Sequence, residues 1–185
     1  MAIHFILGGA RSGKSAYAEK LASEAGLPVT YIATAQVYDD EFAMRIAHHQ
    51  ARRPKDWQLI EAPHYLGDAL RANIHAGRSL VVDCLTLWLA QCICPECAPQ
   101  DAQENIETFW QNERAKFLTQ LQKMQQEKMT TNLILVSNEV GMGIVPLGEI
   151  NRQFQDEQGR LNQAVAHIAD KVSFVAAGLP LNLKG

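Results

Sequence analysis

The sequence predicts a three-layer α/β sandwich with a mostly parallel central sheet. Short apolar runs alternate with longer amphipathic stretches along the chain, which is the pattern of a layered α/β domain. The chain has 185 residues, of which 47% are hydrophobic and 20% charged. This length suits one domain with a full core and is only marginally long enough for two. We therefore expect one domain over residues 1–185.

Apolar runs of strand length mark the expected strands. They lie at 3–7, 29–33, 79–83, 132–137 and 171–176, and a further short strand is expected at 57–61. No repeat, low-complexity tract or linker interrupts the series, as expected for one continuous sheet.

Helices are expected where apolar residues recur at three-and-four spacing. These stretches are 14–25, 40–51, 65–75, 101–128 and 147–169. The segment 92–100 contains two prolines and is expected to be a surface loop, after which Asp101 caps the next helix. Gly159 interrupts the last helix, which we expect to be kinked or split there.

The charge balance excludes some classes of protein. The 17 Lys and Arg residues against 20 Asp and Glu give a formal charge of −3, which argues against a nucleic-acid partner bound through a basic surface. No apolar run approaches the ~20 residues of a membrane span. The first residues lack a basic region and a cleavage site, so no export signal is evident. We expect a cytoplasmic enzyme or binding protein.

Four cysteines lie close together in the sequence. Cys84 precedes the stretch QCICPEC, which holds Cys92, Cys94 and Cys97. A second, separated Cys/His pair, as in a zinc ribbon, is missing. Reduced thiols in a surface loop are the favoured interpretation, and a metal or redox site is the alternative.

The segment GGARSGKS at 8–15 carries a phosphate-binding motif. Gly8, Gly13, Lys14 and Ser15 satisfy G-x-x-x-x-G-K-[ST] between an expected strand and an expected helix. Glycines permit the tight turn there, while backbone N–H groups and the helix dipole face the phosphates. Lys14 would bridge the β and γ phosphates and the Ser15 hydroxyl would ligate Mg²⁺. The motif makes the expected sandwich P-loop NTPase-like; a glycine-rich turn with an incidental Lys and Ser is the alternative.

A carboxylate is expected close to this loop. Asp83 ends the run SLVVD, at the strand edge where ligands of open α/β sheets gather. We expect it to help hold Mg²⁺; a solvent-facing strand-end Asp is the alternative.

A histidine pair lies in the segment DDEFAMRIAHHQARRP at 39–54. On a helix, His49 continues the apolar stripe, whereas His48 shares a face with Arg45 and Arg52. Guanidinium groups attract a polyphosphate and lower the imidazole pKa toward the nucleophilic form. His48 is therefore a candidate nucleophile, with an ordinary solvated basic face as the alternative.

A collinear set of motifs supports a family resemblance. Besides GGARSGKS, the chain carries YIATAQ at 31–36, DDE-x₃-RI-x-HH at 39–49, RP at 53–54, W-x₃-E at 57–61, DCLT at 83–86, NEVGMGIVP at 138–146 and GRLNQ at 159–163. With these it resembles the bifunctional adenosylcobinamide kinase/adenosylcobinamide-phosphate guanylyltransferase family of cobalamin biosynthesis. The most specific features are NEVGMGIVP and the HH helix placed behind a P-loop.

The resemblance implies a two-step enzyme that uses GTP and ATP as substrates. In the first step, a hydroxyl of adenosylcobinamide attacks the γ-phosphate of a nucleoside triphosphate. In the second, His48 attacks the α-phosphate of GTP, and the GMP so held passes to adenosylcobinamide phosphate, giving adenosylcobinamide-GDP. His48 and Lys14 are the implied catalytic residues, and a homotrimer is the implied assembly.

The resemblance also implies a set of GTP contacts. They are Gly8, Gly9, Ala10, Arg11, Ser12, Gly13, Lys14, Ser15, Thr34, Ala35, Gln36, Ala51, Arg52, Arg53, Pro54, Glu61 and Asp83. Asn138 and Glu139, at the mouth of a strand, could orient the phosphates or the corrinoid arm, and strand-to-loop packing is an equal alternative.

Two other functions stay open at this stage. One is guanylyltransferase activity alone, and the other is a GTP-binding regulator that transfers nothing. ATP or GTP preference in the kinase step is open as well.

Overall fold

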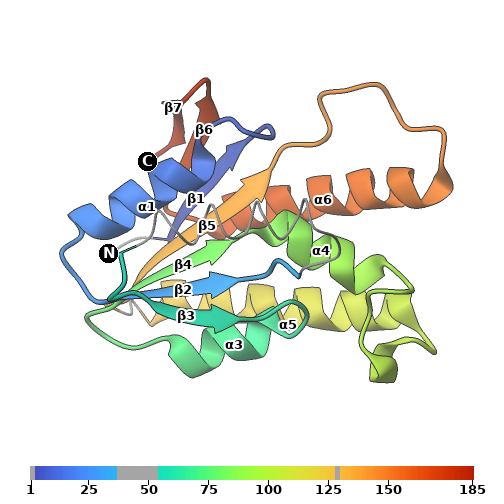
Figure 1. Ribbon diagram of the computed structural model, residues 1–185, viewed down its shortest axis with the longest axis horizontal. Coiled ribbons are helices and arrows are strands. Elements are labelled where there is room, and N and C mark those ends of the chain that lie inside the picture. The colour runs from blue at the N-terminus through green and yellow to red at the C-terminus, as the bar shows by residue number, and fades with distance from the viewer. Residues whose placement is uncertain (1–2, 37–53, 128–129) are drawn as a thin grey trace.

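The computed structural model describes residues 3–36, 54–127 and 130–185. Within these residues, seven strands form one sheet in the order β3-β2-β4-β5-β1-β6-β7, with helices on both faces (Figure 1). All neighbouring pairs are parallel except β6 and β7, which form an antiparallel hairpin. The expected three-layer sandwich with a mostly parallel sheet is confirmed. The strands are β1 (Ile3–Gly8), β2 (Val29–Ala33), β3 (Gln58–Glu61), β4 (Ser79–Asp83), β5 (Asn132–Asn138), β6 (Lys171–Ala176) and β7 (Leu179–Lys184).

The helices divide between the two faces of the sheet. Helix α1 (Lys14–Glu24) packs its buried alanines on one face, against apolar side chains of β1, β2, β4 and β5. The opposite face is covered by α3 (Leu66–Asn73), α4 (Leu85–Ile93), α5 (Ile106–Gln126) and α6 (Glu149–Ile168). The larger core lies on this second face and includes an aromatic group in which Trp88 contacts Trp110 and Phe117, each at a centroid distance of 5.1 Å.

Two elements of the structure were not predicted from the sequence. Helix α4 was not among the expected helices; most of its residues are apolar, so it shows no polar face, and it is buried at the centre of the larger core. Its last turn includes Cys92 and Ile93, so the loop expected from residue 92 begins at Cys94 instead. Strand β7 was also missed, although its alternate leucines at 179, 181 and 183 fit a strand; all its residues are exposed.

Two expected helix signals are wrong. Asp101 lies in a short 3₁₀ turn, Gln100–Ala102, and the cap of α5 is Asn105, whose side chain accepts a hydrogen bond from the Thr108 N–H at 3.0 Å. Helix α6 continues through Gly159 without a break. Glycine costs a helix about 1 kcal/mol relative to alanine, and buried residues on both sides of it, Gln158 and Leu161, anchor α6 to the core.

The expected helix at 40–51 lies outside the described residues. None of the described helices is long and apolar enough to cross a membrane.

Candidate nucleotide-binding site

The parallel strands bring the expected site residues to the carboxyl ends of neighbouring strands. In register, Gly8 of β1 lies beside Asn138 of β5, and Ala33 of β2 lies beside both Asp83 of β4 and Glu61 of β3. These positions are carboxyl ends of parallel strands, where ligands of open α/β sheets bind. The phosphate loop, Asp83 and Glu61 therefore lie at the same end of the sheet.

Two glycines of the loop are required by close packing. A Cβ on Gly8 would lie 2.3 Å from the carbonyl oxygen of Val175. Gly13 has φ +100, and a Cβ there would lie 3.0 Å from the Cα of Gly178. The Gly178 N–H also donates to the Ser12 carbonyl at 2.8 Å. The turn between β6 and β7 thus supports the phosphate loop from behind.

Lys14 begins helix α1 and lies under the loop. Its side chain donates from Nζ to the carbonyl oxygen of Gly9 at 2.8 Å, and only 7% of the residue is exposed. Burial lowers the pKa of Lys14, while the nearby Cys84 and Asp83 oppose that shift. The ammonium is therefore held inside the loop, close to the end of β4.

Two serines flank this lysine. Ser15 lies in the first turn of α1 and is partly exposed. The hydroxyl of Ser12 is buried and has no hydrogen-bond partner among the residues that the structure describes. A buried hydroxyl without a partner costs about 1–3 kcal/mol, so the loop contains a donor that a ligand oxygen would satisfy.

Asp83 is held by a residue that sequence reasoning missed. The Tyr31 hydroxyl donates to Asp83 Oδ2 at 2.7 Å. Tyr31 is 2% exposed and stacks on Trp57 at a centroid distance of 6.3 Å. Since Tyr31 lies two residues before Ala33, it shares a face of β2 with the position beside Asp83. The signal for this contact is the strand register, which the sequence does not reveal.

Thr34 connects the ends of two strands. Its hydroxyl accepts from the Cys84 N–H at 2.9 Å and donates to the Cys84 carbonyl at 2.7 Å. The Gln91 side chain donates to the Thr34 carbonyl. Because Thr34 is fully buried, its hydroxyl fixes the chain after β4, while Ala35 and Gln36 follow it as partly exposed residues.

A buried polar network holds Asn138 from below. Ser137 Oγ accepts from Gln158 Nε2 at 2.9 Å and donates to Asn162 Oδ1 at 2.8 Å. Asn162 Nδ2 in turn donates to the Asn138 carbonyl at 3.1 Å. On the other side, the Asn138 N–H donates to Thr86 Oγ1 at 2.7 Å. Helices α4 and α6 therefore fix the backbone at the end of β5, where the Asn138 side chain donates to Cys84 Sγ at 3.9 Å and Glu139 Oε1 accepts from the Gly141 N–H at 2.7 Å. A role of Asn138 or Glu139 toward phosphates or the corrinoid arm stays a prediction.

The remaining expected residues have different placements. Glu61 and Pro54 are exposed. The predicted site residues His48, Ala51, Arg52 and Arg53 lie outside the described residues, as do His49 and Arg45. The structure therefore brings the loop together with Asp83 and leaves the placement of the histidine helix as a prediction.

Two of the four cysteines are buried and the other two are partly exposed. All four are free, and Cys84 and Cys92 are buried. Burial, and then the charge of Asp83, raises the pKa of Cys84 to about 12. In the described part of the chain, no group of three His, Cys, Asp or Glu residues is arranged to hold a metal ion. The expectation that Cys92 lies in a surface loop is wrong, because Cys92 is fully buried in the last turn of α4.

Comparison with known proteins gives a match over nearly the whole chain. The family described as "Cobinamide kinase / cobinamide phosphate guanyltransferase" matches residues 4–183. A Pseudomonas aeruginosa protein, "Bifunctional adenosylcobalamin biosynthesis protein CobP", is 49% identical over 181 residues, covering 97% of this chain and 96% of its own. The Escherichia coli protein of the same description, CobU, is 35% identical over 180 residues, covering 97% and 98%.

Solved structures agree with the fold. The RadB recombinase superposes with a TM-score of 0.51 at 16% identity, covering 94% of this chain and 73% of its own. The Pyrococcus horikoshii protein PH0250 gives a TM-score of 0.50 at 8% identity, covering 100% and 86%. At such identities these likenesses concern the fold alone.

Proposed function

Because the chain belongs to the cobinamide kinase and cobinamide phosphate guanyltransferase family, we propose that it carries out both reactions at the phosphate loop described above. The single observation that carries this proposal is the loop at 8–15, with Lys14 inside it and Asp83 beside it, in a chain that matches the family from residue 4 to residue 183.

The kinase step uses the loop and its lysine. A hydroxyl oxygen of adenosylcobinamide attacks the γ-phosphorus, the bond to the bridging oxygen breaks, a nucleoside diphosphate leaves, and the hydroxyl proton is released to water. Backbone N–H groups of residues 8–15 and the start of α1 cradle the phosphates. Lys14 exchanges the Gly9 carbonyl for a phosphate oxygen, and the hydroxyl of Ser12 gains an acceptor. Charge developing in the transition state is thereby stabilised by groups already in position.

The donor set also fits Mg²⁺. A hydroxyl at Ser15 and a carboxylate at Asp83 are oxygen ligands of the kind that this ion takes beside substrate phosphates, and it requires no larger protein cage. This agrees with the described residues, which hold no cluster of three acidic, His or Cys ligands. When bound, the ion supplies neutralisation of phosphate charge. Tyr31 keeps Asp83 oriented toward that position.

The guanylyltransferase step uses His48. An imidazole nitrogen attacks the α-phosphorus of GTP, the bond to the bridging oxygen breaks, and pyrophosphate leaves. A phosphate oxygen of adenosylcobinamide phosphate then attacks the same phosphorus, the P–N bond breaks, and the histidine is regenerated. What supports His48 is the HH motif at 39–49, together with the face that His48 would share with Arg45 and Arg52 on the expected helix.

The assembly and the compartment belong to the same proposal. We take the protein to be a cytoplasmic homo-oligomer, with a trimer as the form that the family resemblance implies. Exposed apolar residues in the loop between β5 and α6 support self-association; Met142 is 79% exposed, Ile144 97% and Leu147 98%.

Labelling with nucleotide tests both chemical steps. GTP radiolabelled at the α-phosphate should leave an acid-labile, alkali-stable label on the protein in a denaturing gel. The variant His48→Ala should lose the label, and His49→Ala should keep it. An unlabelled wild-type protein would contradict the covalent step.

A second label separates the kinase from the transferase. Phosphate from γ-labelled nucleotide should reach adenosylcobinamide with the wild type and with His48→Ala alike, and Lys14→Ala should abolish the transfer. Failure of the wild type to transfer phosphate, with covalent labelling intact, would leave guanylyltransferase activity alone. GTP hydrolysis with neither product would indicate the regulator.

A further inference from the structure

Two cysteines lie at the two ends of a turn that the proposed reactions do not use. After α4, the Cys97 N–H donates to the Cys94 carbonyl at 3.1 Å, with Pro95 and Glu96 between them. A hydrogen bond of this kind closes a β-turn, whose end Cα atoms lie less than about 7 Å apart. A disulfide spans Cα separations of about 4.4–6.8 Å. The backbone therefore already has the approach that a cross-link needs.

The Cys94 thiol is held at the turn by a neighbouring side chain. It donates to Glu96 Oε2 at 3.4 Å. Burial raises the pKa of Cys94 to about 11, and the side chains of Cys97 and Glu96 contribute to the shift. The Cys94 thiol is therefore mostly protonated at neutral pH.

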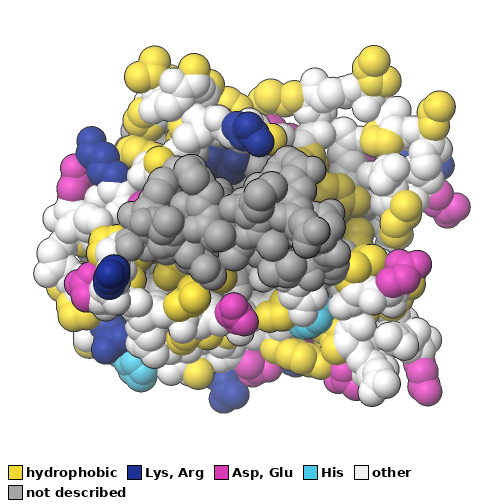
Figure 2. Space-filling view, in the orientation of Figure 1, with side chains coloured by type: hydrophobic (Ala, Val, Ile, Leu, Met, Phe, Trp, Pro, Cys, Tyr) yellow, Lys and Arg dark blue, Asp and Glu magenta, His cyan; other side chains and the backbone are white. Residues whose placement is uncertain are grey.

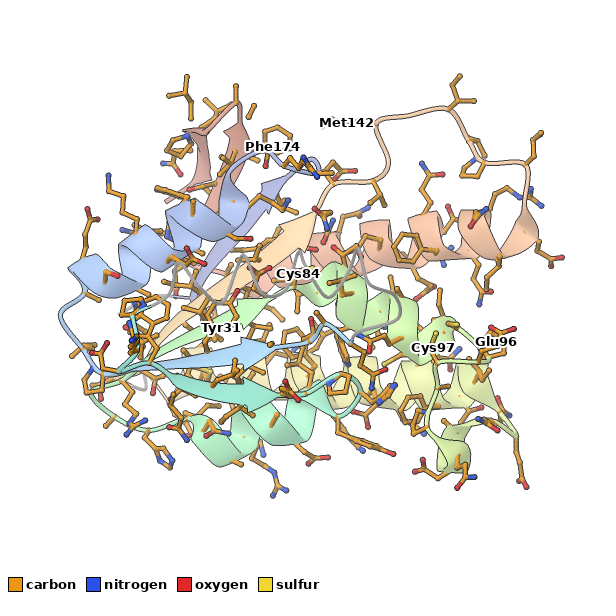
Figure 3. The ribbon with its side chains drawn as sticks, in the orientation of Figure 1. Tyr31, Cys84, Glu96, Cys97, Met142 and Phe174 are labelled. Atoms are coloured by element: carbon orange, nitrogen blue, oxygen red, sulfur yellow. The ribbon has the colours of Figure 1, made fainter. Side chains whose placement is uncertain are left out.

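The two thiols are accessible, in contrast to the other two. Cys94 and Cys97 are partly exposed, whereas Cys84 and Cys92 are buried. Figure 3 shows Glu96 and Cys97 at the end of α4 that lies away from Cys84. A small reagent can therefore reach this pair without entering the core or the phosphate loop.

Neighbouring contacts hold the turn in place. The ring nitrogen Nε2 of His64 hydrogen-bonds with the Cys97 carbonyl at 2.8 Å. The Ala98 N–H donates to the Cys94 carbonyl at 2.9 Å, and the Cys94 N–H donates to that of Ala90 at 3.1 Å. Because both ends of the turn are anchored, closing a bridge requires little movement of the backbone.

We propose that Cys94 and Cys97 are a thiol–disulfide exchange site, which closes to an intramolecular disulfide in reaction with a small-molecule disulfide. One cysteine thiolate attacks a sulfur of the small disulfide, whose S–S bond breaks and releases one small thiol. The second cysteine attacks the protein sulfur of the mixed disulfide and releases the other small thiol. The protein pair loses two electrons, and the small disulfide gains them as two thiols, which take up the two protons.

The helix end favours the closed form of the pair. Cys94 follows the last turn of α4, where the negative end of the helix dipole disfavours a thiolate. Couples become strong oxidants when their reduced, thiolate form is stabilised, whereas burial and the neighbouring Cys97 and Glu96 side chains raise the pKa of Cys94 and disfavour its thiolate. We therefore expect a disulfide that forms slowly and, once formed, resists reduction by a small monothiol more than it resists a dithiol.

Mass spectrometry on the full chain tests the site. The protein is equilibrated with mixtures of oxidised and reduced glutathione, quenched with acid, and alkylated after unfolding. We expect a species lighter by about 2 Da, the mass of two hydrogens, with Cys94 and Cys97 unalkylated and Cys84 and Cys92 alkylated. Dithiothreitol should restore four alkylated cysteines.

Single variants provide the matched controls. Cys94→Ser and Cys97→Ser should each lose the species that is 2 Da lighter than the reduced chain, and thermal melting checks that both variants fold. The proposal is overturned if the folded wild type keeps four alkylated cysteines in oxidised glutathione. Persistence of the lighter species in either variant, or a wild type that stops at the mixed disulfide, would overturn it equally.

Discussion

Lys14 shows how a single residue of the loop is prepared for its ligand. Its ammonium is nearly enclosed and donates to a carbonyl oxygen of the same loop. Enclosure lowers its pKa below the ordinary value of 10.5. The ammonium that attracts phosphate therefore holds its proton less tightly than an exposed lysine does. It loses its charge at a lower pH.

We expect GTP affinity to fall as the pH rises, beginning below the ordinary lysine value. The protonated form binds phosphate, so loss of the proton from free protein weakens binding. Calorimetric titration from neutral to alkaline pH measures this. In Lys14→Arg the guanidinium stays charged, so its affinity should not change over the same range. A wild-type affinity that stays constant up to pH 10.5 would contradict this role for the lysine.

The hydroxyl of Tyr31 is expected to matter for metal use more than for stability. Tyr31→Phe keeps the stacked ring and removes the donor to Asp83 Oδ2. Loss of one such hydrogen bond should cost about 0.5–1.5 kcal/mol in unfolding free energy. The Mg²⁺ concentration that gives half-maximal kinase rate should rise several-fold. Tyr17→Phe on α1 is the control, and an equal rise in both variants would rule out positioning through Asp83.

Some site residues could be predicted from the sequence because their signal is local. The loop at 8–15 and Asp83 are each defined by a motif beside a strand. Tyr31 and the Asn162 network depend on the register and packing of separate elements, which neighbouring residues do not encode. Thr34 was expected among GTP contacts, and its buried hydroxyl shows a further, structural task.

At the level of elements, α5 and α6 are joined by one carboxylate. Glu157 accepts from Trp110 Nε1 at 2.7 Å, from Arg114 at 2.9 Å and from Arg160 at 2.5 Å. Burial would raise the pKa of Glu157, but the hydrogen bonds from Trp110 and Arg160 and the charge of Arg114 lower it below 4.5. Its ionised form is thus favoured in the folded protein.

Replacing this carboxylate should lower stability in a pH-dependent way. We expect Glu157→Gln to lose about 1–3 kcal/mol of unfolding free energy at neutral pH. A lowered folded pKa gives stability that is complete above the unfolded value and is lost as the pH falls through the folded value. The two urea-unfolding curves should therefore converge in acid. The exposed neighbour Asp156→Asn is the control; a difference that persists unchanged in acid would contradict the ionic role.

The elements that the sequence predicted best are those with a clear boundary between apolar and polar positions. Strands β2 and β4 have the expected bounds, and β1, β5 and β6 differ by one residue at most. Helix α4 lacked a polar face because it is enclosed by other helices, and β7 lacked an apolar face toward the core. The placement of α4 is decided by packing against α5 and α6, which come later in the chain, and that of β7 by its pairing with β6.

At the scale of the whole molecule, apolar side chains are exposed on two projections. Figure 2 shows hydrophobic side chains on the β6–β7 hairpin and on the long loop between β5 and α6. Leu179, Leu181 and Leu183 of β7 are 57–73% exposed. Large apolar surfaces of this kind on a folded chain are typical of protein–protein contacts.

The assembly should therefore depend on the loop between β5 and α6. We expect sedimentation to give a mass above the 20.5 kDa of one chain, and Ile144→Asp with Leu147→Lys to shift the protein toward that mass. Leu59→Lys on the opposite sheet edge is the control, since Leu59 is also exposed, at 45%. Dissociation by Leu59→Lys alone would place the contact on the other side of the sheet.

The support that Gly178 gives to the phosphate loop has a consequence for the order of synthesis. Residues 8–13 leave the ribosome early, but the backbone that packs against Gly13 and bonds to Ser12 comes from the turn between β6 and β7. The loop therefore cannot reach its final packing until residue 178 has been translated. A nascent chain therefore contains the nucleotide motif long before it contains the turn that packs against this motif.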